Sequence, residues 1–103
     1  MPRSRVDLHN ELVSVFGSRY VYYQPPESVK LHYPCVIYSK DRVDQRRAND
    51  SIYSLTNVYN VTVVGKDPDS DTAERLLRHF MHCRFDRRYV ADGLYHDVLT
   101  LHY

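Results

Sequence analysis

The chain has no tryptophan, only three glycines and only two cysteines among its 103 residues. So few glycines leave no Gly-rich phosphate loop, and the nucleophile-elbow and cysteine-protease signatures are absent as well. The two cysteines, Cys35 and Cys83, lack the spacing of a disulfide framework, and this predicts buried, reduced thiols. The sequence therefore shows neither a recognised catalytic motif nor a disulfide scaffold.

Long apolar runs and a strong excess of one charge are also missing. No window approaches the roughly 20 apolar residues needed to cross a bilayer. The first residues lead into a polar helix instead of a signal-peptide apolar region, so we expect a cytoplasmic protein with no membrane partner. The formal net charge is +1, which gives no general electrostatic reason to bind nucleic acid, because that affinity comes largely from neutralising phosphates.

What the chain does contain is ordinary for a globular protein, except for its tyrosines. Hydrophobic residues make up 43% and charged residues 26%, which predicts a single folded domain over residues 1–103. There are ten tyrosines. Tyrosine suits half-buried strand faces and subunit interfaces, but strand propensity alone also explains the number, and both interpretations stay open.

Two amphipathic helices are predicted. Ser4 and Asp7 form a capping-box-like start, after which apolar residues recur at helical spacing until Gly17. The second helix follows a turn at residues 65–70, with Asp69, Ser70 or Asp71 as its cap. Its apolar face comprises Ala73, Leu76, Leu77, Phe80 and Met81.

Five strands are predicted around these helices. Residues 20–24 form a short one, stopped by Pro25 and Pro26 because proline lacks a donor for the ladder. Residues 34–39 are apolar on both faces and end abruptly, and residues 52–64 alternate. Two further strands, at 84–90 and 94–102, flank the turn pair Asp92-Gly93.

Residues 40–51 are highly charged, and we expect an exposed, mobile hairpin arm here between two strands. Together the segments predict an α+β fold, with a mostly antiparallel sheet and two helices packed on one face, in the order α-β-β-β-α-β-β.

Three catalytic or metal-binding interpretations compete with capping and surface roles. His79, His82 and Cys83 would need a fourth zinc ligand such as His96 or His32, and the helix dipole alone explains basic residues at a helix end. A triad using His96 and Asp97 is excluded by alternation, which points them to opposite faces. The sequence Asp67-Pro-Asp-Ser-Asp71 begins like a calcium loop but lacks its glycine and final glutamate, so capping explains it better. We therefore expect no metal, no cofactor and no enzymatic activity.

The chain nevertheless resembles a known family. Its two Tyr-rich strand segments, residues 20–38 and 85–103, and the helix start at Asp67-Pro-Asp-Ser70 between them resemble the tail terminator, or head-tail joining, proteins of long-tailed bacteriophages and prophages. The resemblance spans nearly the whole chain. It implies a structural subunit of the virion neck, assembled in the host cytoplasm, that caps the tail tube as a homo-oligomeric ring. The ring would be a hexamer that ends tail polymerisation and docks to the head, with the tail tube protein and a head-completion or connector protein as partners.

The contact residues are predicted from exposure and residue type instead, because interface cores favour Tyr and Arg. The candidates for subunit or tail contacts are Tyr22, Tyr23, Arg42, Arg46, Arg47, Arg87 and Arg88. These arginines are interleaved with aspartates, so a solvated surface is the competing interpretation. In a ring, repeated basic clusters would also make non-specific contact with DNA in the lumen.

Three alternatives to a terminator remain. One is a head-side adaptor or tail completion protein, which belongs to the same assembly class. The second is a small nucleic-acid-binding regulator that uses the arm, and the third is a metal-dependent enzyme.

Overall fold

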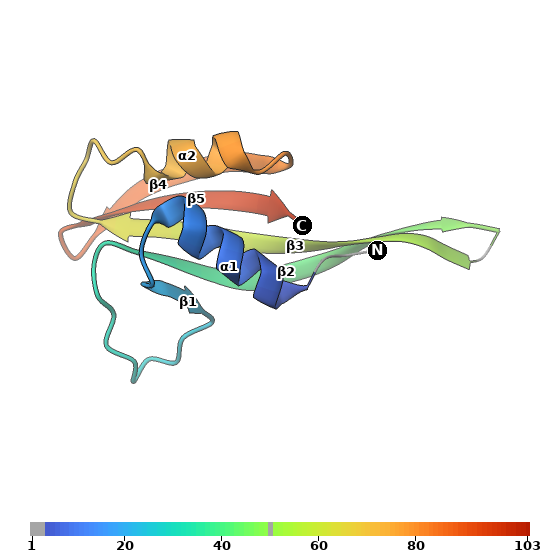
Figure 1. Cartoon of the computed structure of the whole chain (residues 1–103), viewed down its shortest axis with the longest axis horizontal. Coiled ribbons are helices and arrows are strands. Elements are labelled where there is room, and N and C mark those ends of the chain that lie inside the picture. The colour runs from blue at the N-terminus through green and yellow to red at the C-terminus, as the bar shows by residue number, and fades with distance from the viewer. Residues whose placement is uncertain (1–3, 50) are drawn as a thin grey trace.

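The computed structural model describes residues 4–49 and 51–103, with the main chain alone at residues 52 and 53. Its elements are α1 (Arg5–Phe16), β1 (Val21–Tyr23), β2 (Cys35–Ala48), β3 (Ser51–Gly65), α2 (Thr72–His79), β4 (Cys83–Ala91) and β5 (Leu94–His102) (Figure 1). The predicted order of helices and strands is confirmed.

The five strands form one sheet in the order β1-β2-β3-β5-β4. β1 runs parallel to β2, whereas the other three neighbouring pairs are antiparallel. The predicted α+β architecture with a mostly antiparallel sheet is therefore confirmed. β1 lies at one edge of the sheet. The prolines that follow it have no N–H to donate, and at an edge this leaves no neighbouring strand without a hydrogen-bond partner.

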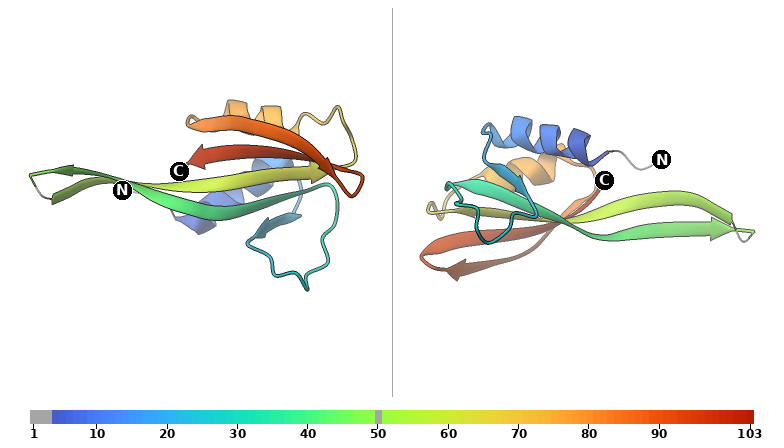
Figure 2. Two further views of the ribbon diagram at one scale, coloured as in Figure 1. Left: turned by 180° about the vertical axis from the view of Figure 1, so that it is seen from behind. Right: turned by 90° about the horizontal axis from the view of Figure 1, so that it is seen from below.

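Both helices cover the same face of the sheet (Figure 2). Leu8 and Leu12 of α1 and Leu76 of α2 are almost completely buried. They share one core cluster with strand residues that alternate onto that face, namely Val36, Tyr38, Tyr59, Val61, Val63, Leu99 and Leu101. Burying each such leucine stabilises the fold by roughly 1.5–3 kcal/mol. Among the described residues, no helix lies on the opposite face of the sheet.

The ends of α1 follow the sequence closely. The Ser4 hydroxyl accepts a hydrogen bond from the Asp7 N–H at 3.1 Å, and Gly17 takes the left-handed conformation with φ 80°. The Gly17 N–H donates to the Val13 carbonyl at 2.8 Å. These contacts satisfy main-chain groups that the helix leaves unpaired, so the predicted boundaries are confirmed.

The second helix is shorter than its apolar periodicity predicts. α2 ends at His79, Phe80 is extended, and Met81 is 90% exposed, so its predicted place on the apolar helix face was wrong. The chain leaves the helix here because β4 must begin at Cys83, and strand pairing overrides local periodicity. At the other end Asp71 occupies the cap position without a side-chain cap bond, and its carboxylate instead pairs with Arg75 at 3.2 Å.

The charged segment after Ser39 is strand, so the predicted end of this strand was wrong. β2 continues to Ala48 and pairs with β3 down to Ser51, with irregularities between Lys40 and Arg42 and between Arg46 and Arg47. Charged side chains mark exposure here and do not interrupt the main-chain ladder. We call residues 40–48 of β2 and 51–57 of β3 the arm. It extends well beyond both helices (Figures 1 and 2), and the molecule measures 51 × 28 × 24 Å.

Candidate assembly surface

Among the residues that the structure describes, no third strand lies beside the arm. β5 pairs with β3 at residues 58–65 and the Tyr103 N–H donates to the Asn57 carbonyl, so residues 51–56 of β3 have β2 as their ladder partner and an open edge on the other side. Residues 40–49 are all exposed. A two-stranded ribbon is marginally stable at best on its own in water. An arm of this length is therefore well suited to being stabilised by contact with another molecule.

The two faces of the arm differ in chemistry. Val43 pairs with Asn57 and Leu55 pairs with Gln45, and alternation places these four residues on one face. Val43 is 45% and Leu55 36% exposed. The other face carries Arg42, Asp44, Arg46, Ser54 and Thr56. The arm is thus an amphipathic ribbon whose apolar side chains face solvent.

The three arm arginines are not equivalent. Arg42 pairs with Asp41 at 2.7 Å and with Asp44 at 3.0 Å, and hydrogen bonds from its guanidinium to Asp44 and then Asp41 raise its pKa. Arg46 and Arg47 lie farther out and are exposed, and neither forms an ion pair with another described residue. Arg46 and Arg47 are therefore the arm charges best placed to meet a partner.

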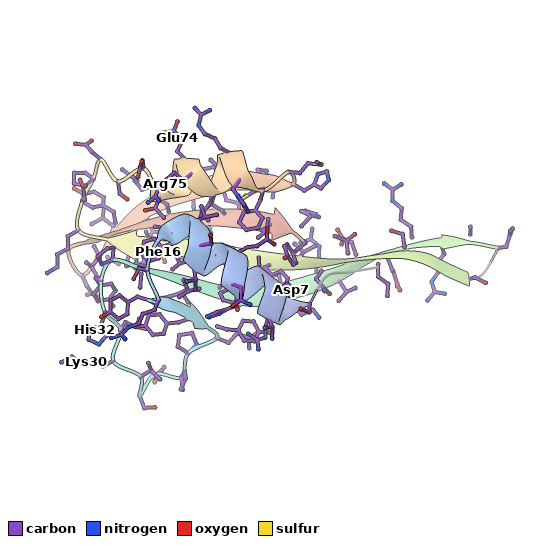
Figure 3. All side chains as sticks on the ribbon, in the orientation of Figure 1. Asp7, Phe16, Lys30, His32, Glu74 and Arg75 are labelled. Atoms are coloured by element: carbon purple, nitrogen blue, oxygen red, sulfur yellow. The ribbon has the colours of Figure 1, made fainter. Side chains whose placement is uncertain are left out.

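The predicted pair Tyr22 and Tyr23 does not form one surface. The two residues point to opposite faces of the sheet, and both are half-buried. The Tyr22 hydroxyl accepts from the His32 N–H at 3.3 Å, on the loop that Figure 3 shows with His32 and Lys30. The Tyr23 ring lies 4.9 Å from that of Tyr38 and 4.4 Å from the Arg5 guanidinium. Both tyrosines are engaged in internal contacts.

Arg87 and Arg88 also separate, because neighbouring strand residues face opposite ways. Arg88 makes a two-point ion pair with Asp97 and donates to the Pro68 carbonyl at 3.0 Å. Arg87 lies on the face without helices, with its guanidinium 5.6 Å from the Tyr89 ring. β1 and β4 are opposite edges of the sheet, so the seven predicted contact residues fall into three separate groups.

The tyrosines are divided between the core and the surface. Tyr38, Tyr59 and Tyr103 are buried, whereas Tyr33 and Tyr89 are exposed. The Tyr38 hydroxyl lies 2.8 Å from His9 Nδ1 and accepts from Arg5 at 3.2 Å. Much of the tyrosine content thus supports the fold, and Tyr89, stacked on His96 with ring centres 4.6 Å apart, is the exposed aromatic on a strand of the uncovered face.

The candidate metal and catalytic residues do not converge. His79 lies 3.1 Å from Glu11 on α1, and Cys83 packs against the core, where burial raises its pKa to about 11. Within residues 4–49 and 51–103 no group of three or more His, Cys, Asp or Glu side chains is arranged to hold a metal ion. His96 and Asp97 point to opposite faces, as alternation predicts. Cys35 and Cys83 are free thiols, Cys35 fully buried and Cys83 half-buried.

The acidic turn before α2 is structural. Asp67 accepts a hydrogen bond from the Asp69 N–H at 2.9 Å, and Ser70 Oγ accepts from the Thr72 N–H at 3.4 Å. A cavity of about 280 Å³ lies next to this turn and is lined in part by Tyr95 and Asp97. The Asp97 carboxylate in this cavity is bound by Arg88.

No family model, curated protein or solved structure matches the chain. In the part of the chain that the structure describes, no helix is long and apolar enough to cross a membrane.

Sequence reasoning predicted a strand over residues 52–64 but did not place its first residues, 51–57, in the arm. Residues 51–57, Ser-Ile-Tyr-Ser-Leu-Thr-Asn, contain no charged residue, whereas the facing strand carries six between Lys40 and Arg47. The signal was present, because alternation starts at residue 52 and Asn49 precedes it as a turn former. Asn49 does adopt a positive φ of 53°, which asparagine tolerates.

Proposed function

We propose that this protein is a structural subunit of virion assembly, similar to the tail terminators of long-tailed phages. It caps the tail tube as a ring of identical copies, ends tail polymerisation and provides the surface to which the filled head docks. The chain acts by binding and performs no chemistry. Its partners are further copies of itself, the tail tube protein and a head-completion or connector protein.

The observation that carries this proposal is the exposed arm. Its strands are long, yet Val43 and Leu55 face solvent, and the β5 ladder does not extend along it. Apolar side chains on a ribbon with so little support favour burial against another molecule. An assembly subunit provides that burial, whereas a protein acting alone would gain nothing from it.

The shape of the chain suits a ring. The arm projects at one end of the long axis, and the turn between β4 and β5 lies toward the other (Figure 1). Contacts between unlike ends of a molecule are heterologous, and such contacts generate closed rings when the rotation between copies closes. The fold thus supports a head-to-tail arrangement.

The proposal is tested by inactivating the gene in a phage or prophage that carries it and measuring tail lengths in negative-stain images. A terminator predicts tails of uncontrolled length, because nothing stops polymerisation. Supplying the wild-type chain restores uniform length. Tails of normal length that lack heads would overturn the terminator role and favour a head-side adaptor or tail completion protein.

A nucleic-acid-binding regulator is favoured by one specific feature. A two-stranded ribbon fits the DNA major groove, and the arm presents Arg46 and Arg47 on such a ribbon. The test is the binding of duplex DNA by the isolated chain at several salt concentrations. Affinity that falls steeply with salt and is lost in the double variant Arg46→Ala, Arg47→Ala would support the regulator. Absence of binding at low salt would exclude it.

A further inference from the structure

The open edges of the sheet are protected to very different degrees. Natural sheets guard their edges with short strands, prolines, charges or bulges, because an open edge accepts any extended chain. β1 has three residues and is followed by Pro25 and Pro26. The β2 side of the arm is dense in charge and irregular at Asp41. β4 carries its four charged residues and its irregularity at Asp86 within residues 84–88, and its end at residues 89–91 is uncharged.

The β3 side of the arm has one irregularity, between Ile52 and Ser54 opposite Arg46 and Arg47, and otherwise lacks this protection. Residues 51–57 contain no charge, no proline and no glycine. The open edge begins where the pairing of β3 with β5 ends, and the last contact there is the hydrogen bond of 2.8 Å that the Tyr103 N–H donates to the Asn57 carbonyl. An uncharged open edge of this length is a site for strand addition.

The direction of the main-chain groups can be derived from the ladder. The Asn57 carbonyl points toward β5, away from β2. In an antiparallel pair the direction alternates along the strand, and a residue and its opposite number both point inward or both point outward. Leu55 therefore directs its N–H and carbonyl to the open β3 edge, and its pair Gln45 directs its own to the charged β2 edge.

The β4 edge offers a matching strand on a second copy. The His102 N–H donates to the His82 carbonyl, and the same alternation, followed along the β4–β5 register, directs the N–H of Arg88 and Val90 outward. Val90 is 61% exposed, and Phe85 and Tyr89 on the same strand are also exposed. β4 therefore combines outward hydrogen-bonding groups with uncovered apolar side chains.

The charges on the two edges of the arm determine which edge can pair with β4. Between residues 83 and 91 β4 has three arginines and one aspartate. The β2 edge of the arm is also net basic, with Lys40, Arg42, Arg46 and Arg47 against Asp41 and Asp44, so pairing it with β4 would oppose like charges. The uncharged β3 edge avoids this opposition, and it brings Leu55 alongside the exposed side chains of β4.

We infer that residues 51–57 of one copy pair by strand addition with β4 of the next copy. This inference rests on the proposed ring and specifies its subunit contact. The contact joins two different edges, so each copy pairs with one neighbour through the β3 edge of its arm and with the other neighbour through its β4 edge. Such a head-to-tail interface generates a closed ring when the rotation between copies closes, and every copy then uses each of its two edges once.

Proline substitution on opposite edges of the arm provides a matched test. Leu55→Pro removes the outward donor on the β3 edge, and Gln45→Pro removes the outward donor of the opposite residue on the β2 edge. Both leave the hydrogen bonds between β2 and β3 in place, and both impose the same local restriction. Solution mass is measured by light scattering across a concentration series, with circular dichroism to compare folding.

The wild type and Gln45→Pro are expected to assemble, while Leu55→Pro stays at the chain mass of 12.2 kDa. Assembly by Leu55→Pro, or loss of assembly in Gln45→Pro alone, would overturn the inference. A wild-type chain that is monomeric throughout the series would overturn it too.

Mixing two variants tests the pairing of unlike edges even if one proline disturbs the arm. Val90→Pro blocks the β4 edge and leaves the arm intact, whereas Leu55→Pro does the reverse. Each is expected to be monomeric alone, and an equimolar mixture is expected to form a dimer that grows no further, because it has one usable interface. Self-assembly of Val90→Pro alone would show that arms pair with arms and would contradict the inference.

These outcomes are separate from the tail-length test. Tails of uncontrolled length after gene inactivation, together with assembly by Leu55→Pro, would leave the proposed function standing and reject the strand pairing. Tails of normal length after gene inactivation, together with a dimer in the mixture of variants, would reject the proposed function and leave the strand pairing standing.

Discussion

Arg88 and Asp97 face each other across β4 and β5, and two hydrogen bonds of 2.6 and 3.1 Å join the guanidinium to the carboxylate. Asp97 is only 5% exposed, and Arg88 is its ion-pair partner. Hydrogen bonding to Asp97 raises the pKa of Arg88. The pair also reaches the turn before α2, because Arg88 donates to the Pro68 carbonyl.

Arg88→Ala is therefore expected to lower the thermal unfolding temperature, because it leaves a buried carboxylate without its partner. Arg87→Ala is the matched control, since its side chain lies on the opposite, solvent-facing side of the same strand. Equal unfolding temperatures for the two variants would show that the ion pair is not structural.

The attachment of α1 to the sheet is tested at Leu12. Leu12 is completely buried in the main core cluster, so Leu12→Ala is expected to lower the free energy of unfolding by about 2–5 kcal/mol. Val6 lies on the same helix and is 57% exposed, and Val6→Ala is expected to change it by less than about 0.5 kcal/mol. Urea unfolding measures both. A small effect at Leu12 would contradict the packing of α1.

Stability should depend on pH through His9. Burial, and then the neighbouring Arg5 guanidinium, lower the pKa of His9 from its ordinary value of 6.5. The unfolded chain then binds a proton more readily than the folded one, so stability is full above pH 6.5 and declines as the pH falls from there through the folded-state pKa.

The check is urea unfolding of the wild type and His9→Gln at about pH 5 and about pH 7.5. The wild type is expected to lose more stability at the lower pH than the variant, since the other histidines are common to both. An identical loss in the two proteins would rule out His9 as the cause.

Reversing the charge of the outer arm should impair assembly without unfolding the chain. The double variant Arg46→Glu, Arg47→Glu changes exposed residues, so its circular dichroism spectrum should match the wild type. Docking to the tail should weaken. The double variant Lys30→Glu, Lys66→Glu makes the same change of net charge at exposed positions outside the arm and serves as control. Wild-type assembly by the arm variant would reject a contact role for Arg46 and Arg47.

Much of the fold was predictable because the relevant signals are local. The α1 boundaries depend on Ser4 and Gly17, and the last hairpin depends on Asp92-Gly93, which adopt the positive φ values of 53° and 72° that this turn requires. The end of α2 was not predictable in this way. Phe80 and Met81 continue the helical period, and only the pairing of β4 with β5 shows where the chain must become extended.

The contact surface was less predictable, because it depends on register between distant segments. Tyr22 and Tyr23 were chosen by residue type, yet alternation within β1 turns them to opposite faces. Nothing local to Arg88 indicates Asp97 as its partner. The contrast between the charged β2 edge and the uncharged β3 edge became informative only when the pairing of the arm strands was known.

The central claim, that the protein caps a growing tail tube, is tested most directly by tube elongation in vitro. Purified tail tube protein is allowed to polymerise with and without the chain, and tube lengths and ends are compared by negative-stain electron microscopy. The account predicts density at one end of the tubes and an arrest of elongation at amounts of the chain that match the number of tube ends. Tubes that keep lengthening while the chain stays unbound in solution would contradict it.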